Sequence, residues 1–330
     1  MIGWQDRSVL VTGAGGFIGS HLVATLARAG ARVRALLHYS ARTDWANLEL
    51  LEPDLHKNIE IITGDLNDPI SVDTAVRGSQ TVFHLGAIIS VPHSFHSPSA
   101  YIDTNVKGTL NVLSAAYRHQ VTRLIHISSS EVYGNTTAAR IDESHKLQAQ
   151  SPYAASKIAA DKLVESYVQG FALPAVTVRP FNNYGPRQSP RAIVPTIVAQ
   201  ALRGGMIQLG ALDAERDLLY VGDTVHGLLL AAESERAIGE VINLGTGVAI
   251  SVRALAEKIS ALLGITADLI VDEQRLRPGR SEVWRLCADA DKAKELLGWC
   301  AETSLDEGLT LTIDWIRTHA PLHWPERYQY

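Results

Sequence analysis

The sequence is poor in sulfur and has no long apolar run. It contains only two cysteines, Cys287 and Cys300, among 330 residues. Two isolated cysteines cannot build a disulfide framework, and they fit a reducing compartment better than a secreted scaffold. No apolar stretch approaches the ~20 residues of a membrane span, and the first residues lack the basic and apolar regions of a signal peptide. We therefore expect a soluble, cytoplasmic protein.

The charge composition argues against nucleic-acid binding. Thirty Lys and Arg stand against 35 Asp and Glu, which gives a formal net charge of −5, without the basic footprint of a nucleic-acid-binding protein. A hydrophobic content of 46% and a charged content of 20% are ordinary for a folded chain. A length of 330 residues exceeds one typical core, so we expect a large α/β domain with a smaller one attached.

A glycine-rich segment follows the first predicted strand. Residues 8–12 read Ser-Val-Leu-Val-Thr and indicate a buried strand, and an amphipathic helix is predicted over about 20–29. A strand, a glycine-rich turn and a helix in this order are typical of a dinucleotide-binding loop. Glycines let the backbone approach a pyrophosphate, and the helix N-terminus offers it free N–H groups. The candidate cofactor-binding residues here are Gly13, Gly16, Phe17, Ile18 and Gly19.

The end of the second predicted strand, over 32–37, bears on which nicotinamide cofactor is bound. NAD-preferring sites usually place Asp or Glu there, to bind the ribose 2′-hydroxyl. Here the chain continues with His38, Ser40 and Arg42, and no acid occurs before Asp44. These residues suit a 2′-phosphate, so NADP is slightly favoured over NAD. The alternative is a tolerant loop that decides nothing.

Strands and helices continue to alternate, which predicts a parallel sheet. Further strands are expected at 59–63, 81–87, 123–128, 175–179 and about 240–244. Ligands of such sheets bind outside the carboxyl ends of the strands. Leu85 and Ala87 at one strand end leave room for a cofactor, and Ser129, Ser130 and Glu131 follow the next strand. We predict a Rossmann doubly wound parallel sheet from 1–180 plus about 217–245, and a smaller C-terminal α/β substrate domain from 181–216 and 246–330.

Tyr153 and Lys157 lie four residues apart in a predicted helix, so their side chains share one face. A lysine cation close to a phenol favours the phenolate and lowers the tyrosine pKa from about 10. A phenol with a lowered pKa is a suitable general base. Taken alone, such a pair is far more often an ordinary solvated helix face, because short spacings of this kind are unspecific.

Five arginines could hold a diphosphate, because the guanidinium fork matches phosphate oxygens. They are Arg187, Arg191, Arg216, Arg277 and Arg280, and some of them will be ordinary surface charges. His84 and His93 are interpreted as core or loop histidines, since no matching ligand set surrounds them in the sequence. No metal site is expected.

Several motifs occur in an order typical of one family, over nearly the whole chain. They are Gly13-x-x-Gly16-x-x-Gly19, Asp65-Leu66, Asn105, Ser129, Tyr153-x-x-x-Lys157, Arg179-Pro180-x-Asn182-x-Tyr184-Gly185-Pro186 and Arg216-Asp217-x-x-Tyr220-Val221-x-Asp223. Together they resemble the extended short-chain dehydrogenase/reductase family of nucleotide-sugar epimerases, dehydratases and decarboxylases. The resemblance implies a tightly bound NAD(P) recycled within each turnover, held also by Asp65, Leu66, Asn105, Tyr153 and Lys157. It also implies a homodimer through a four-helix bundle of helices near 105–118 and 153–167.

The resemblance also implies roles for the catalytic candidates. Tyr153 would take the proton of the sugar C4 hydroxyl while hydride passes to the nicotinamide, helped by Lys157 and Ser129. Glu131 stands where dehydratases of this family carry the base for the C5 proton. Ser130 replaces the usual aspartate that protonates the departing C6 hydroxyl, so a water, Glu131 itself or another group would have to supply that proton.

Segments 92–98 and 179–192 resemble 4,6-dehydratases that begin legionaminic-acid-type sugar synthesis and act on nucleotide-linked N-acetylglucosamine. This implies a substrate site with Ser90, His93, Asn182, Arg187, Arg191, Arg216 and Arg277. The first hypothesis is a 4,6-dehydratase of UDP- or GDP-N-acetylglucosamine. The alternatives are a UDP-glucuronate decarboxylase, which shares the Ser-Ser-Glu pattern, a 4-epimerase, and a non-catalytic NAD(P)-binding regulator.

Overall fold

The computed structural model describes residues 3–39, 44–204, 206–279 and 281–319. Its centre is a seven-stranded parallel sheet in the order β10-β6-β5-β4-β1-β2-β3. The strands are β1 (Ser8–Thr12), β2 (Arg32–His38), β3 (Ile59–Gly64), β4 (Thr81–His84), β5 (Arg123–Ile127), β6 (Ala175–Pro180) and β10 (Val241–Leu244). The predicted Rossmann-type doubly wound sheet is therefore confirmed, including the return of the chain to the sheet near residue 241.

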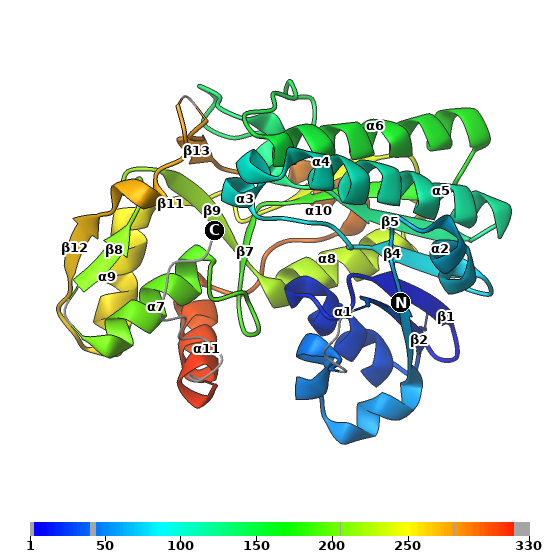
Figure 1. Ribbon diagram of the computed structural model, residues 1–330, viewed down its shortest axis with the longest axis horizontal. Coiled ribbons are helices and arrows are strands. Elements are labelled where there is room, and N and C mark those ends of the chain that lie inside the picture. Colours follow the sequence, from blue (N-terminus) through cyan, green and yellow to red (C-terminus); the bar gives the residue numbers. More distant parts are fainter. Residues whose placement is uncertain (1–2, 40–43, 205, 280, 320–330) are drawn as a thin grey trace.

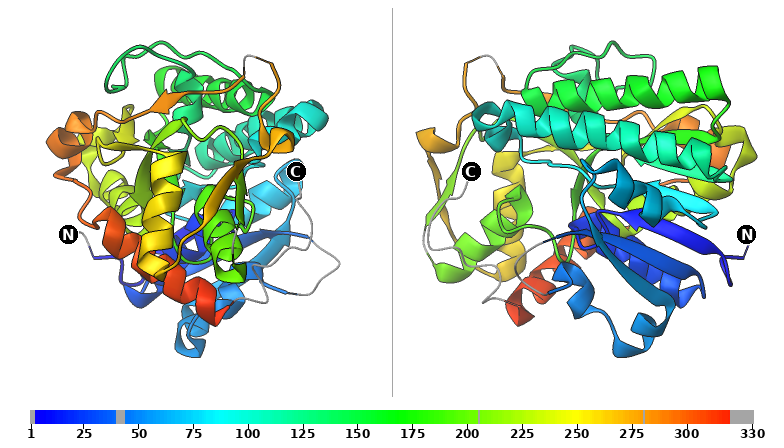
Figure 2. Two further views of the ribbon diagram at one scale, coloured as in Figure 1. Left: turned by 90° about the vertical axis from the view of Figure 1, so that its left-hand side faces the viewer. Right: turned by 45° about the vertical axis from the view of Figure 1, so that its right-hand side comes forward.

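Helices cover both faces of this sheet, so its central strands are buried on both sides. Figure 1 shows α5 and α6 side by side above the sheet and α1 and α8 below it, and the right-hand view of Figure 2 again shows α5 and α6 side by side. The upper layer holds α2 (Pro69–Val76), α5 (Gly108–Arg118) and α6 (Pro152–Phe171), and the lower layer holds α1 (Phe17–Arg28), α8 (Val221–Glu233) and α10 (Asp291–Leu297). None of the described helices is long and apolar enough to cross a bilayer.

The second region is built from short strands and longer helices, at the left of Figure 1. Strand β9 (Glu215–Tyr220) pairs with β7 (Asn182–Tyr184), β11 (Ala249–Ser251) and β13 (Arg285–Leu286), and β8 (Met206–Leu209) pairs with β12 (Asp268–Val271). Helices α7 (Ile193–Arg203), α9 (Val252–Leu263) and α11 (Leu305–Thr318) enclose its core. The boundary expected at about 217 falls inside β9, and the chain rejoins the Rossmann layers with α8, which packs on α1.

Short helical turns complete the described part of the chain. Between β4 and α5 lie α3 (Val91–His96), α4 (Pro98–Tyr101) and η3 (Ile102–Lys107), and η4 (Ser130–Tyr133) follows β5. The remaining turns are η1 (Ala46–Leu50), η2 (Pro53–Asn58), η5 (Glu235–Ala237) and η6 (Glu273–Arg275). The elements α3, α4 and η4 surround the start of α6, where the catalytic candidates lie.

Candidate active site

The catalytic candidates meet where β5 ends and α6 begins. Ser151 caps α6 by accepting a hydrogen bond from the Ala154 N–H at 3.1 Å, which fixes the first turn and the Tyr153 side chain in it. Ser129 caps η4 in the same way, since its Oγ accepts from the Glu131 N–H at 3.2 Å. The Ser129 hydroxyl and the Tyr153 side chain share a hydrogen bond. The contact needed for acid–base work on a sugar hydroxyl is thus built into the fold.

Lys157 is buried one turn further along α6 and points at the sheet. Its Nζ donates a hydrogen bond to the backbone carbonyl of Ile127 at 2.6 Å. Burial lowers the pKa of Lys157 to about 8, and the Asp161 carboxylate opposes this shift. The Lys157 ammonium is therefore held against Ile127, the last residue of β5, and Ser129 follows two residues later in the chain.

The expected lowering of the Tyr153 pKa is not found. Burial raises the pKa of Tyr153, the hydrogen bond from Ser129 opposes this, and the carboxylates of Glu131 and Asp161 add to it. The physical reason is that the phenol lies in a dry site near negative charges, whereas Lys157 gives its hydrogen bond to the backbone. Tyr153 is consequently a protonated phenol in this structure.

Glu131 is paired with one of the arginines expected to hold a diphosphate. Arg277 donates from Nη1 and Nη2 to the two Glu131 carboxylate oxygens, each at 3.0 Å. Burial alone would raise the pKa of Glu131, but Arg277 and Arg216 outweigh it and lower the pKa below its usual value. Glu131 is therefore a carboxylate at neutral pH, and Ser130 beside it is buried.

A second carboxylate, Glu282, extends this pair into a chain of four charges. Arg216 Nη2 donates to Glu282 Oε1 at 3.2 Å, and Arg277 Nε lies 3.6 Å from the same oxygen. We call Glu131, Arg277, Glu282 and Arg216 the outer network. Sequence reasoning missed Glu282, because no motif marks an acid whose partners are distant in sequence.

Tyr101 is a further residue that sequence reasoning missed. Its ring meets Tyr153 edge-on with 6.3 Å between centroids, and its hydroxyl donates to the Ser90 carbonyl at 2.6 Å. His93 Nδ1 lies 3.3 Å from the same hydroxyl. Burial raises the pKa of Tyr101 to about 12, and the charge of Arg191 opposes the shift. Two predicted substrate residues, Ser90 and His93, therefore contact Tyr101 beside Tyr153, and the charge of a third, Arg191, acts on the same hydroxyl.

Two other predicted substrate residues present buried polar atoms. Asn182 Oδ1 and Arg187 Nη1 are buried and, within the described part of the chain, find no hydrogen-bond partner. Arg187 has a φ of +65°, in the loop after β7. This loop is fixed to α1, since His21 Nε2 lies 2.9 Å from the Pro186 carbonyl oxygen. Buried polar groups normally have partners, so both atoms suit a polar ligand.

The glycine-rich turn fits a dinucleotide. Gly13 has a φ of +67°, and a Cβ there would lie 2.8 Å from the Gly86 nitrogen. A Cβ on Gly19 would lie 2.2 Å from the Gly13 oxygen, so both glycines are required for close packing. Gly16 is the N-cap of α1 without a side-chain cap, and the first turn, with Phe17 and Ile18, has no acid. A pyrophosphate suits this helix end.

Other predicted cofactor residues lie at the ends of β2, β3 and β4. His38 Nε2 lies 3.9 Å from Asp65 Oδ2 at the ends of β2 and β3. Leu85 and Ala87 follow β4 as predicted, and Leu66 packs so closely that a Cβ on Gly86 would meet it at 2.7 Å. Ser40, Arg42 and Arg280 lie outside the described residues.

The Asn105 amide is engaged by the protein rather than free for a cofactor. Its Oδ1 accepts from the Ile88 N–H at 2.8 Å, and its Nδ2 donates to the Ile88 carbonyl at 3.0 Å and to Ser156 Oγ at 2.9 Å. Asn105 therefore holds the loop after β4 against α6. His84 is similarly structural, between Thr12 Oγ1 at 2.8 Å and Thr109 Oγ1 at 3.0 Å.

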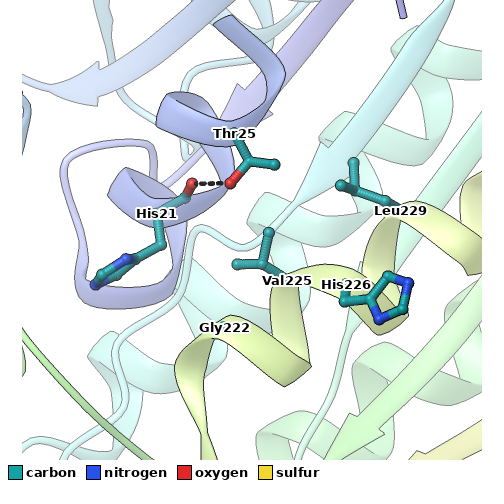
Figure 3. A pocket seen from close by; sticks show the side chains of 6 residues that line it. All are labelled: His21, Thr25, Gly222, Val225, His226 and Leu229. Atoms are coloured by element: carbon teal, nitrogen blue, oxygen red, sulfur yellow. Dashed lines mark hydrogen bonds between the residues drawn. The ribbon is translucent and has the colours of Figure 1, made fainter. Parts of the chain in front are cut away.

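A hollow of about 190 Å³ lies away from these residues, between α1 and α8. Figure 3 shows its lining and the His21 and His226 rings turned away from one another. The lining residues are His21, Thr25, Gly222, Val225, His226 and Leu229. None of the predicted site residues is among them, so this hollow is separate from the candidate active site.

Comparison with known proteins identifies the family. The family model described as GDP-mannose 4,6 dehydratase matches residues 10–312. The chain belongs to this family. It is 35% identical over 314 residues to a dTDP-glucose 4,6-dehydratase of Streptomyces antibioticus, covering 94% of this chain and 92% of the relative.

Two solved structures show the same architecture. The dTDP-glucose 4,6-dehydratase DesIV of Streptomyces venezuelae, a double mutant with NAD bound, matches with a TM-score of 0.86 and 30% identity over 96% of this chain and all of its own. The UDP-glucuronic acid 4-epimerase of Bacillus cereus, with UDP-glucuronic acid and NAD, matches with a TM-score of 0.86 and 29% identity over 95% of this chain and all of its own. The resemblance to NAD-dependent nucleotide-sugar dehydratases and epimerases is confirmed, whereas the legionaminic-acid type stays a prediction.

Proposed function

We propose that this family member is a nucleotide-sugar 4,6-dehydratase. Tyr153, once it has given up its own proton, takes the proton of the C4 hydroxyl as the C4 hydride leaves, and Ser129 hydrogen-bonds the C4 oxygen. The resulting ketone acidifies the C5 hydrogen, which Glu131 removes. Loss of the C6 hydroxyl as water and return of the hydride to C6, with a proton to C5, complete a 4-keto-6-deoxy sugar.

The observation that carries the proposal is the place of Glu131. Its carboxylate is ionised and buried, two residues after Ser129, and Ser129 is hydrogen-bonded to Tyr153. A base for C5 is therefore adjacent to the groups that oxidise C4. Because Ser130 is a poor acid, Glu131 itself passes the C5 proton to the departing C6 hydroxyl, so that proton leaves in the water formed.

A nicotinamide cofactor, NAD or NADP, accepts and returns the hydride when bound. The glycine-rich turn and the start of α1 would hold its pyrophosphate, and Tyr153 and Lys157 are the residues that would serve its nicotinamide end. The slight preference for NADP depends on Ser40 and Arg42 and stays a prediction. The Asp65 carboxylate near His38 would oppose a 2′-phosphate. The cofactor released on denaturing the purified protein, separated chromatographically, decides between NADP and NAD.

The substrate is a nucleotide-linked hexose, with UDP- or GDP-N-acetylglucosamine as first choices. Its diphosphate competes with Glu131 and Glu282 for Arg277 and Arg216, since guanidinium groups bind phosphate and carboxylate in the same way. Arg187 and Asn182 offer unpartnered polar atoms to the nucleotide or sugar. Substrate binding therefore opens the outer network and releases Glu131 as a base.

The proposal is tested by mass spectrometry of nucleotide sugars incubated with the purified protein and no added cofactor. UDP-N-acetylglucosamine, GDP-linked hexosamines and UDP- and dTDP-glucose are tried in parallel. Loss of one water from any of them supports the proposal. Unchanged masses throughout the panel would overturn it.

A second candidate is supported by the Glu131–Arg277 pair. The Arg277 guanidinium, which donates to both carboxylate oxygens of Glu131, could instead donate to the C6 carboxylate of a uronic acid. UDP-glucuronate would then lose carbon dioxide, or be epimerised at C4 with no change of mass. Incubation with UDP-glucuronate distinguishes these outcomes, and no reaction with any nucleotide sugar would favour a non-catalytic NAD(P)-binding regulator.

We also propose that the protein is a homodimer through α5 and α6. Three large apolar side chains of these helices are half exposed, namely Tyr117 at 50%, Phe171 at 51% and Leu110 at 38%. Four helices, two from each copy, would cover them. A monomer elution volume that persists at high protein concentration would contradict this.

A further inference from the structure

A buried arginine behind the catalytic residues contacts both elements that carry them. Arg179 belongs to β6, and its Nε and Nη2 donate to Asp161 Oδ2 at 3.0 and 2.9 Å. Its Nη1 donates to the Tyr133 hydroxyl at 2.9 Å. Asp161 lies on α6, one turn after Lys157, and Tyr133 lies in η4, two residues after Glu131.

We propose that Arg179 is a positioning residue for the reaction, with Asp161 and Tyr133 as its two anchors. Arg179 fixes α6, which carries Tyr153 and Lys157, relative to η4, which carries Glu131. The proposal rests on the proposed function, because it concerns the geometry between the group that acts at C4 and the group that acts at C5.

The geometry of the guanidinium makes this assignment specific. The planar fork directs donors to two acceptors at fixed angles, and one guanidinium therefore sets the relation between two elements. The Tyr133 hydroxyl is itself fixed from the other side, because it donates to Asn243 Oδ1 at 2.7 Å. The Arg179 guanidinium also lies over the Tyr133 ring, 5.0 Å from its centroid.

Stability alone does not explain this arrangement. The Arg179 and Asp161 side chains are each only 4% exposed, and a buried ion pair of this kind is often replaceable by apolar residues without loss of stability. A lysine would keep the charge but could not reach both anchors with directed donors. What the pair supplies is a fixed distance between two catalytic elements, and small misplacements of reacting groups are costly.

The charge of Asp161 adds a second, separable effect. Asp161 supports the Lys157 ammonium and opposes the Tyr153 phenolate, so its removal moves both ionisations to lower pH. The other charged and titratable groups that act on Lys157 or Asp161 are His84, His126 and Arg179, and Glu131 and Tyr101 act on Tyr153. His126 Nε2 lies 3.3 Å from Asp161 Oδ1, and burial lowers the pKa of both histidines, so they stay neutral when Asp161 is changed.

The test compares Tyr133→Phe, Arg179→Lys and Asp161→Asn in the full-length protein. Tyr133→Phe keeps the ring and removes one anchor, so we expect kcat to fall by about tenfold to a hundredfold with KM little changed. Arg179→Lys should lower kcat similarly without moving the pH profile. Asp161→Asn should move the whole pH–rate profile to lower pH. Folding is checked by thermal melting, and rates are compared below the lowest melting temperature.

Tyr167→Phe is the matched control. Tyr167 lies on α6, the helix that also carries Asp161, and this variant loses only the hydrogen bond between the Tyr167 hydroxyl and Ser114 Oγ at 2.8 Å. A Tyr133→Phe variant no slower than Tyr167→Phe would overturn the proposal, and an unmoved pH profile in Asp161→Asn would overturn the second effect, that of the Asp161 charge. If the wild type dehydrates no nucleotide sugar, the proposed function fails separately. Single-turnover reduction of the bound cofactor by a nucleotide sugar then still reports the effect of the three variants, because it needs Ser129, which caps η4, beside Tyr153 on α6.

Discussion

Two arginine–carboxylate networks lie on either side of the catalytic residues, and they differ in burial and in what they join. Arg179 and Asp161, each 4% exposed, join elements of the Rossmann domain. Arg277 and Glu131, at 17% and 10% exposure, join the Rossmann domain to the smaller one. The inner pair is anchored by protein groups alone, whereas the outer pair consists of groups that a nucleotide sugar would use. Arginine–carboxylate hydrogen bonding therefore fixes geometry in one place and is open to competition in the other.

The largest expected effect concerns the base held by the outer network. Glu131→Gln keeps the shape of the side chain and removes its basicity. We expect dehydration to slow by about 10²–10⁴-fold, the usual contribution of a general acid–base group. Reduction of the bound cofactor on substrate addition should persist, because it needs Tyr153 rather than Glu131. Dehydrated product from Glu131→Gln at near the wild-type rate would contradict the role given to Glu131.

The second-largest expected effect is a difference in the free energy of unfolding between variants of the two networks. Arg179→Met leaves the buried Asp161 carboxylate without its main partner, which should lower the free energy of unfolding by about 3–5 kcal/mol. Arg277→Met leaves Glu131 near Arg216 and at the domain boundary, and we expect a loss of about 1–3 kcal/mol. Urea unfolding of both variants measures the difference. Equal losses would mean that the outer pair is as structural as the inner one.

The pH dependence of activity tests the role of Lys157, which lies on α6 one turn before Asp161 of the inner pair. The pKa of Lys157 is lowered from 10.5 to about 8, so kcat should fall as pH rises through about 8, when the ammonium is lost. Between about pH 8 and 10.5 Lys157 is protonated in the unfolded chain and largely deprotonated in the folded one. The unfolded chain therefore binds more protons, so the contribution of Lys157 to the free energy of unfolding increases as pH rises. Activity lost together with thermal stability in this range would point to alkaline unfolding instead of titration of Lys157.

The smallest expected effect is on affinity at the outer network. Glu282→Gln removes a carboxylate that competes with the substrate diphosphate for Arg216 and Arg277. We expect UDP to bind about twofold to fivefold more tightly, as for a partly exposed ion pair. Isothermal titration calorimetry measures this. Glu240→Gln, which breaks the remote Lys292 pair at 2.7 Å, is the control and should leave UDP affinity unchanged, so weaker UDP binding only in Glu282→Gln would argue against competition.

The parts of the molecule that could be predicted from sequence are those specified by local patterns. The first strand was expected at 8–12 and occupies Ser8–Thr12, because a short β-branched run before a glycine-rich turn specifies it. Ser129 and Tyr153 were both expected at the site from motifs at the end of a strand and the start of a helix, but the hydrogen bond between them was not predicted. The two-residue strand β13 is too short to leave a periodic pattern.

The remainder could not be predicted, because it depends on tertiary contacts. Glu131 and Arg277 are 146 residues apart in sequence, and each was assigned to a different ligand rather than to the other. The direction of the Tyr153 pKa was wrong for a related reason: the spacing to Lys157 is local, but burial and the neighbouring carboxylates are set by the fold.

The most direct test of the account is mass spectrometry of the product formed in deuterated water from the nucleotide sugar that reacts. The account predicts loss of one water and gain of one deuterium at C5, because Glu131 removes the C5 proton and a solvent-derived one returns. A product of unchanged mass without deuterium would mean epimerisation at C4. That result would contradict the central claim, which is that Glu131 acts on C5 after Tyr153 acts on C4.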